Sequence, residues 1–500
     1  MPTFGQTLRN SGMQAVILAL LVASVAQVAD NPDAKPPVTI DDVRIVQRAK
    51  AIIDSPAKWN RADNRVCPAD ATTFSIYCAL EKATKEIGGS FEHRGAAMQE
   101  ARFVIDDIAP NASEYEHRLM DYNNDPTTSF EHLQKFFTLL EARVQERLAL
   151  ENAFRELGEM CARDAGRMWG TSLCGPTLLV DPKTRGVTSN EPAPAPVLPQ
   201  SIGIANTSVE WGGKLWTMVM LPLPQNDYDR RVLLVHESFH RIQKGLGLFI
   251  GQEGGNAHLD TVDGRVWLQL EWRALAAALQ GDRGALDDAL AFRAKRRSLF
   301  PKAAEEEHGL EFREGLAEYT GTAFAEPSLP KRIPHLVEAL REAEKKPSFV
   351  RSFAYASGPA WGAMLEMQGK RPTEDVEPAL SRLEPAGEPV LRAQRYGYTE
   401  LLAKEKARDE KKQATLREFR ARFVDGPVLV LPLRKFSFEM DPNASIPFEP
   451  YGTVFPTLTL RDGWGSIIVK RGGAMISSDW TRLTVPFPAN DDYVLTLKDR

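Results

Sequence analysis

The sequence predicts an α+β fold that is mostly helical, with a helical domain near the N-terminus and a β module at the C-terminus. Apolar residues recur at spacings of three and four between residues 40 and 159, and again between residues 231 and 243. After Gly426 the pattern changes to short stretches of alternating residues separated by turn signals. Because 500 residues are more than one hydrophobic core usually holds, we expect two or three domains.

The overall composition is that of an ordinary globular protein. Hydrophobic residues make up 43% of the chain and charged residues 26%, so neither a collagen-like nor a disordered chain is indicated. The formal net charge is −5, and no long basic run opposes it. We therefore expect no nucleic-acid partner.

The first 28 residues have the three parts of a secretory signal peptide. Arg9 provides a positive charge, residues 15–26 are apolar, and Ser24-Val25-Ala26 form a small-residue cleavage pattern. The apolar stretch is shorter than the roughly 20 residues of a membrane-spanning helix, which disfavours an uncleaved anchor. We expect an exported protein, periplasmic or secreted, without stable membrane insertion after signal cleavage.

The number of cysteines agrees with export, because disulfides persist in oxidising compartments. The four cysteines are Cys67, Cys78, Cys161 and Cys174. Three pairings are possible, and the spacing favours two local bridges, Cys67–Cys78 and Cys161–Cys174. Structural thiols in a core are the alternative, and a cysteine metal site is disfavoured because no pair has CxxC spacing.

Residues 40–158 are predicted to form a helical accessory domain, because their apolar side chains recur at helical spacing. A His-Arg pair occurs twice in this domain, as His93-Arg94 and as His117-Arg118. The repetition suggests either a ligand-binding face or a solvated helix surface. We favour the solvated surface.

Residues 159–424 are predicted to form the central domain, which begins with strands. Thr177 to Asp181 is a short β-type stretch, and Val209 to Leu223 is expected to form one or two strands. A Pro-rich segment from Glu191 to Pro199 lies between them and is expected to be extended or looped. A helix over residues 231–243 comes after the strands.

Within this helix His236, Glu237 and His240 form the pattern H-E-x-x-H. On a helix the two histidines lie one turn apart on the same face and can bind one metal ion together. Glu237 lies beside the first histidine, where its carboxylate can reach a water on the metal. The alternative is a helix with two hydrogen-bonded histidines. The apolar neighbours disfavour it, because imidazoles on a core-facing stripe need partners.

The segment L-V-H-E-S-F-H-R-I, residues 234–242, resembles the zinc-binding helix of the zincin metallopeptidases. Ser238 and Phe239 are uncharged, as that family prefers, whereas Arg241 replaces the usual uncharged residue. Downstream segments resemble the gluzincin branch, in which the third ligand is a Glu. The resemblance implies a zincin-like metallopeptidase domain over residues 159–424, one zinc ion per chain, and a peptide or protein substrate.

Two carboxylates compete for the third ligand position. The segment E-F-R-E-G-L-A-E-Y, which contains Glu314 and Glu318, resembles the E-G-x-A stretch that carries the third ligand in several gluzincins. In that family a residue at the position of Glu318 hydrogen-bonds a ligating His. Glu271 is the alternative, because its helical neighbours are apolar and a buried carboxylate needs a metal or a cation. We favour Glu314 and expect Glu271 to pair with an Arg or with substrate.

Two residues are candidates for stabilising an oxyanion. The segment F-A-Y-A-S-G, which contains Tyr355, resembles the Tyr-x-x-Gly element of gluzincins, whose Tyr hydroxyl donates to the tetrahedral intermediate. His258 lies in a Gly-rich segment, residues 245–264, which is expected to be a flexible loop near the cleft. The alternatives are an ordinary core Tyr and a loop-capping His.

Residues 403–422 are predicted to form a charged helix that ends the catalytic part. Residues 425–500 are expected to form a β-rich C-terminal module with short alternating strands and turns such as Asp462-Gly463. This module would be a sandwich or half-barrel that contacts substrate or a partner, or a lid over the helical core.

Together these features predict an exported zinc-dependent hydrolase, a metallopeptidase with a metal-activated water and Glu237 as general base. The alternative is a zinc-stabilised, non-catalytic binding protein of the cell envelope. A hydrolase of non-peptide amides or esters would share all of these residues. The sequence does not predict the oligomeric state.

Overall fold

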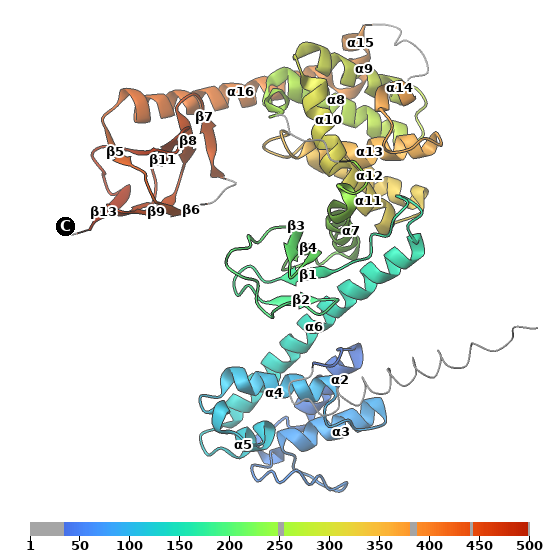
Figure 1. Cartoon of the computed structure of the whole chain (residues 1–500), viewed down its shortest axis with the longest axis vertical. Coiled ribbons are helices and arrows are strands. Elements are labelled where there is room, and N and C mark those ends of the chain that lie inside the picture. Colours follow the sequence, from blue (N-terminus) through green and yellow to red (C-terminus); the bar gives the residue numbers. More distant parts are fainter. Residues whose placement is uncertain (1–34, 249–254, 381–387, 441–443, 499–500) are drawn as a thin grey trace, which may run out of the picture. The chain divides into compact units, whose positions relative to one another are not determined.

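The computed structural model describes residues 35–248, 255–380, 388–440 and 444–498, so the predicted signal peptide lies outside the described residues. Over these residues the fold is α+β and mostly helical, as predicted, with three small sheets (Figure 1). They form two compact units: residues 35–248 with 320–328, and residues 255–319 with those from 329 onwards. No helix in the described ranges has the length and apolar character needed to cross a bilayer.

The first unit begins with a helical domain around one apolar core. Its helices are α2 (Ile40–Ile52), α3 (Ile76–Gly88), α4 (Ala96–Ile108), α5 (Arg118–Asn124) and α6 (Phe130–Asp164). The apolar stripes of these helices face one another, and Val46, Leu80 and Phe136 are fully buried. Because α6 continues to Asp164, the predicted domain boundary at residue 158 falls inside a helix.

One of the two predicted disulfides is present. Cys67 and Cys78 are bonded, which ties the loop before α3 to the first turn of that helix. The predicted Cys161–Cys174 bridge is wrong, because both residues are free thiols. Burial and a hydrogen bond with Cys174 raise the pKa of the Cys161 thiol. The two thiols are therefore near each other but not covalently joined.

Replacing both Cys67 and Cys78 with Ser is expected to lower the free energy of unfolding by about 2–4 kcal/mol, because the bridge restricts the unfolded chain. Chemical denaturation of the whole chain, followed by circular dichroism, measures the change. Cys174→Ser is the matched control, since Cys174 is exposed and unbonded, and it should change stability by less than about 0.5 kcal/mol. Equal stability of the double variant and this control would contradict the prediction.

A four-stranded sheet comes after α6 in the first unit. Its strands are β1 (Thr177–Val180), β2 (Val187–Ser189), β3 (Thr207–Trp211) and β4 (Lys214–Met220), in the order β2-β1-β4-β3. β1 and β4 are parallel, and the other neighbours are antiparallel. The stretch predicted as one or two strands is thus a hairpin, β3–β4. The helix α7 (Asp227–Gln243) contacts both strands of this hairpin.

The second unit is built mainly from helices that share one core, with Trp272, Phe292 and Phe353 buried in it. Its elements are η3 (Ala257–Asp260), α8 (Val262–Leu279), α9 (Ala285–Leu299), α10 (Ala303–Leu310), η4 (Glu311–Gly315), α12 (Leu329–Ala343), α13 (Phe353–Met367), α14 (Val376–Leu380), α15 (Pro389–Ala393), η5 (Gln394–Tyr396) and α16 (Tyr398–Arg420). The helix α11 (Leu316–Ala325) begins in this unit and ends in the first.

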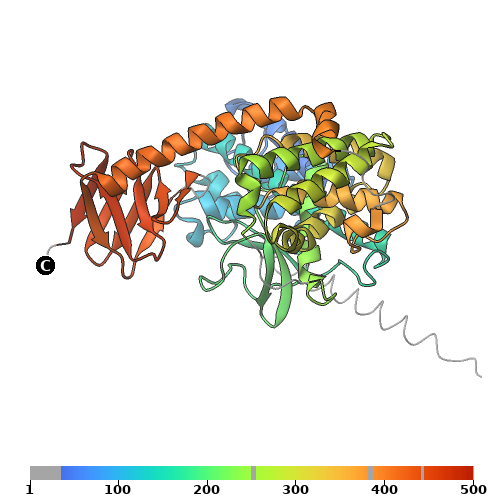
Figure 2. The ribbon, with the colours of Figure 1, turned by 90° about the horizontal axis from the view of Figure 1, so that it is seen from above.

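The C-terminal β module consists of two antiparallel sheets that α16 and the turn η6 (Ala421–Asp425) lead into (Figure 2). Its strands are β5 (Val428–Pro432), β6 (Ser437–Glu439), β7 (Ile446–Phe448), β8 (Gly452–Phe455), β9 (Leu458–Asp462), β10 (Gly465–Val469), β11 (Ala474–Ser477), β12 (Arg482–Pro486) and β13 (Tyr493–Leu497). Residues of both sheets, such as Leu460 and Ile476, form one core, so the module is a sandwich.

Candidate metal centre

The helix α7 presents the H-E-x-x-H pattern from a buried face. Asn226 caps its N-terminus by accepting a hydrogen bond from the Asp229 backbone N–H at 3.1 Å. Apolar residues of the same helix, including Phe239, are fully buried. His236 and Glu237 are 4% and 5% exposed, so these polar groups lie in the interior and not on a solvated surface.

Contacts with the preceding helix and sheet position α7. Arg230 donates two hydrogen bonds to the carboxylate of Glu156 on α6, with N–O distances of 3.1 and 3.0 Å. The helix α7 also contacts β3 and β4. Trp169 packs on Phe239, with ring centroids 5.0 Å apart. These contacts fix the rotation of the helix and therefore the direction of its histidines.

Glu314 lies on η4, a single π-helical turn between α10 and α11. Further along the same helical run, Gly321 of α11 packs against α7. A Cβ atom at position 321 would lie 2.7 Å from the carbonyl oxygen of Val232, so only glycine allows this approach. This close contact packs the C-terminal part of α11 against α7 within the first unit.

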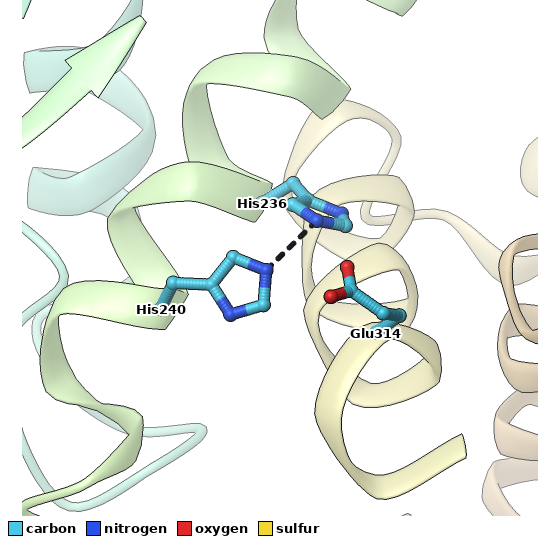
Figure 3. Close-up of side chains that lie close together, drawn as sticks. All are labelled: His236, His240 and Glu314. Atoms are coloured by element: carbon cyan, nitrogen blue, oxygen red, sulfur yellow. Dashed lines mark hydrogen bonds between the residues drawn. The ribbon is translucent and has the colours of Figure 1, made fainter. Parts of the chain in front are cut away.

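His236, His240 and Glu314 form a cluster, with one ligand atom from each lying within 4.8 Å of the others. Figure 3 shows the two imidazoles from α7 and the carboxylate from η4 pointing toward one another. The Nε2 atoms of the histidines are 3.0 Å apart. Zinc binds such ligands at about 2.0–2.2 Å, so a pair at this spacing needs little movement to share one ion. Two imidazoles and a carboxylate are a donor set that suits zinc.

Gln243 gives His240 a fixed orientation. The Nδ1 atom of His240 lies 3.0 Å from the side-chain oxygen of Gln243 on the same helix. A carboxamide oxygen only accepts, so Nδ1 carries the proton and Nε2 has its lone pair directed at the cluster. This is the tautomer that a metal ligand requires. Gln243 was not identified from the sequence, although its spacing of three from His240 predicts such a contact.

The carboxylate of Glu314 is held by two neighbours. The Tyr355 hydroxyl of α13 donates to one oxygen at 2.7 Å, and Arg313 Nε lies 3.3 Å from the other. η4 and α13 approach closely, since a Cβ atom at Gly358 would lie 2.4 Å from the Cα atom of Gly315. Tyr355 therefore lies next to a predicted metal ligand and is partly exposed to solvent. Arg313 was not identified from the sequence.

The alternative ligand Glu271 lies in a different environment. It is fully buried, as expected, but its carboxylate interacts with the guanidinium groups of Arg293 and Arg296. Trp361 Nε1 donates to the same carboxylate at 2.8 Å. These partners compensate the buried charge. Glu271 therefore forms an ion pair with Arg, which is one of the two roles expected for it if Glu314 is the ligand.

Two further predicted residues lie outside the cluster. His258 Nε2 is 2.9 Å from Glu307, and its ring packs against Phe300, so its contacts are those of a structural histidine in η3. Glu318 is half-buried on α11, one turn after Glu314. Its role as a partner of a ligating histidine stays a prediction.

Comparisons of the chain with models of protein families, with curated proteins and with solved structures find no match. A function is therefore inferred from the cluster itself: its donor atoms, its burial and the neighbours that orient it.

Proposed function

We propose that this chain is an exported zinc-dependent hydrolase of the gluzincin type that cleaves peptide bonds. The cluster of His236, His240 and Glu314 is the observation that carries the proposal, because it joins the predicted ligands from two separate segments. The carboxylate of the alternative ligand, Glu271, forms ion pairs with Arg293 and Arg296. The disulfide between Cys67 and Cys78 supports export, since such bonds persist outside the cytoplasm.

In this proposal the two histidines and Glu314 hold the ion. Zinc at this position supplies a Lewis acid that polarises a carbonyl group and lowers the pKa of water. Glu237 comes directly after the first histidine on α7 and is buried, so its carboxylate accepts a proton from the attacking water and passes it to the leaving amine. The Tyr355 hydroxyl, which donates to Glu314 in the structure, would change partner and donate to the developing oxyanion.

The sheet beside α7 offers a way to orient an extended peptide. β3 is an edge strand that, among the described strands, pairs only with β4, and it contacts α7. The resemblance to zincins implies that a substrate backbone pairs with such an edge. The peptide bond would then lie across the helix that carries Glu237.

A cleavage assay with a mixture of peptides, analysed by mass spectrometry, tests the proposal. We expect cleavage by the zinc-loaded chain, loss of cleavage after treatment with a chelator, and recovery when zinc is added. A folded chain that binds one zinc ion and cleaves neither peptides nor simple amides and esters would contradict the enzyme proposal. It would instead support a zinc-stabilised binding protein.

Replacing Tyr355 with Phe separates two roles of its hydroxyl. If the hydroxyl stabilises the oxyanion, kcat should fall by about 10²–10³-fold while zinc affinity is retained. If it only orients Glu314, zinc affinity should instead fall by about 10–100-fold. We expect the first result. The measurements are steady-state kinetics on a cleaved peptide and competition for zinc with a chelating dye, and unchanged kinetics would remove Tyr355 from the mechanism.

A further inference from the structure

The helical domain of the first unit contains a second feature, a pocket of about 270 Å³. Both His-Arg pairs line it, although they come from different segments: His93-Arg94 precedes α4, and His117-Arg118 lies at the start of α5. His93 is exposed and Arg94, His117 and Arg118 are partly buried, so a solvated surface and a ligand-binding face both stay possible for these pairs. Further basic lining comes from α4 and from the loop before α3.

The charge of this pocket is unbalanced. Its lining contains four arginines and one glutamate. Arg118 is paired with Asp106, with an Nε–Oδ1 distance of 2.9 Å. Within the described residues, Arg65, Arg94 and Arg102 have no carboxylate at ion-pair distance. Three guanidinium groups thus face one small cavity without an acidic partner.

Arg94 and Arg102 are partly buried and Arg65 is exposed, and Arg102 is the most informative because its hydrogen-bond partners are defined. Its guanidinium donates to the Gln99 side-chain oxygen and to the His93 carbonyl oxygen at 3.0 Å, and it lies 3.1 Å from His93 Nε2. All of these partners are neutral. Burial and the charges of Arg94 and Arg118 lower the pKa of Arg102 to about 10. An anion in the pocket would offset this unfavourable environment.

The hydrogen bonds of the neighbouring His93 leave the Tyr77 hydroxyl proton available for a ligand in the pocket. An arginine only donates, so the hydrogen-bond network assigns a lone pair to His93 Nε2 and the proton to Nδ1. Nδ1 lies 3.3 Å from the Tyr77 hydroxyl oxygen, which accepts that proton. Burial, together with the charge of Arg102, lowers the pKa of His93, in agreement with a neutral ring. The Tyr77 hydroxyl has no other hydrogen bond within the described residues, so it can donate to a ligand.

Several other arginines of low exposure within the described residues are paired with carboxylates, whereas Arg185 and Arg241 donate to backbone carbonyl oxygens. Arg143 Nε lies 2.7 Å from the buried Glu100, and Arg265 Nε lies 2.7 Å from the buried Glu405. Unpaired guanidinium groups around a cavity are instead the arrangement that recognises oxyanions, because their N–H groups donate in pairs to planar or tetrahedral oxygen sets.

We propose that this pocket binds the phosphoryl or sulfuryl group of a small ligand. A doubly charged oxyanion matches three uncompensated cations better than a single carboxylate, and its several oxygens can accept from Arg65, Arg94, Arg102 and Tyr77 together. The site is separate from the metal centre, and the proposal does not depend on hydrolase activity.

Calorimetric titration of the purified chain with inorganic phosphate, at an ionic strength fixed with sodium chloride, tests the site. The variants are Arg102→Gln and Arg94→Gln, and the matched control is Arg44→Gln, an exposed α2 arginine paired with Asp41. We expect wild type and the control to bind phosphate equally, and each pocket variant to bind at least about tenfold more weakly. The Arg94 side chain makes no hydrogen bond within the described residues, so this variant keeps the test valid if Arg102→Gln impairs folding.

Two further binding experiments distinguish a soluble phosphate ester from a lipid headgroup as the ligand. Titration with glycerol 3-phosphate represents a soluble ester, and sedimentation with phosphatidylcholine vesicles that contain phosphatidic acid represents a lipid headgroup. Saturable binding in either arm that is lost in Arg102→Gln supports the proposal and identifies the source. Absence of binding to phosphate and to both esters, or equal binding by all variants, would overturn it.

Discussion

Replacing Glu237 with Gln is expected to lower kcat/KM for peptide hydrolysis by about 10²–10⁴-fold while one zinc ion per chain is retained. The amide cannot accept the proton of the attacking water, so the general-base step is lost. Zinc should stay bound because the predicted ligands, His236, His240 and Glu314, are unchanged. Steady-state kinetics and metal analysis of the same preparation measure the two quantities.

The control for this variant is Glu159→Gln, an equivalent change at an exposed position of α6. It should leave kcat/KM unchanged. If Glu237→Gln kept full activity with zinc bound, another group would have to act as the base, and the proposed mechanism would be wrong. If the variant lost both zinc and activity, Glu237 would be acting as a ligand.

The largest effect on metal binding is expected from Glu314→Gln. Comparison with Glu271→Gln decides which of the two carboxylates is the third ligand. Loss of a direct ligand should weaken zinc binding by more than the 10–100-fold typical of outer-shell partners, so metal should be absent after dialysis. Glu271→Gln should keep one zinc ion per chain but lower the free energy of unfolding by about 3–5 kcal/mol, because it leaves Arg293 and Arg296 partly uncompensated.

Metal analysis and chemical denaturation measure the bound zinc and the free energy of unfolding of both variants. Each carboxylate should affect one quantity strongly and the other weakly. Zinc loss in Glu271→Gln with retention in Glu314→Gln would exchange the two roles and contradict the cluster. A wild-type chain that is folded and takes up no zinc would remove the metal centre altogether.

The sequence predicts the parts of the site that depend on local spacing. Two histidines four residues apart on a helix share a face because of the helix period alone, and α7 has this form. The burial of Glu271 is predicted in the same way by its apolar helical neighbours. Local spacing does not predict which cation meets that carboxylate, because Arg293 and Arg296 come from another helix, α9.

Contacts between distant segments account for the other differences. His258 was a candidate for the oxyanion, but its partner Glu307 is 49 residues away in sequence. The second disulfide was inferred from the short separation of Cys161 and Cys174, which fixes proximity but not bonding. The sheet order of the C-terminal module likewise depends on long-range pairing that alternation alone does not specify.

The π-helical turn η4 affects which charged groups the carboxylates of one helical run contact. Glu307, Glu311 and Glu314 are spaced by four and three, so on an uninterrupted α-helix they would share one face. Glu307 and Glu311 interact with Arg296 and Arg293. Glu311 and Glu314 both lie within the π turn, whose wider period changes the angle between their side chains relative to an α-helix. The carboxylate of Glu314 contacts Tyr355 and Arg313, and in the proposed function it is a metal ligand. Deleting one residue from this turn is expected to move the Glu314 carboxylate toward the arginines and to weaken zinc binding at the proposed site, while every proposed ligand stays in the chain.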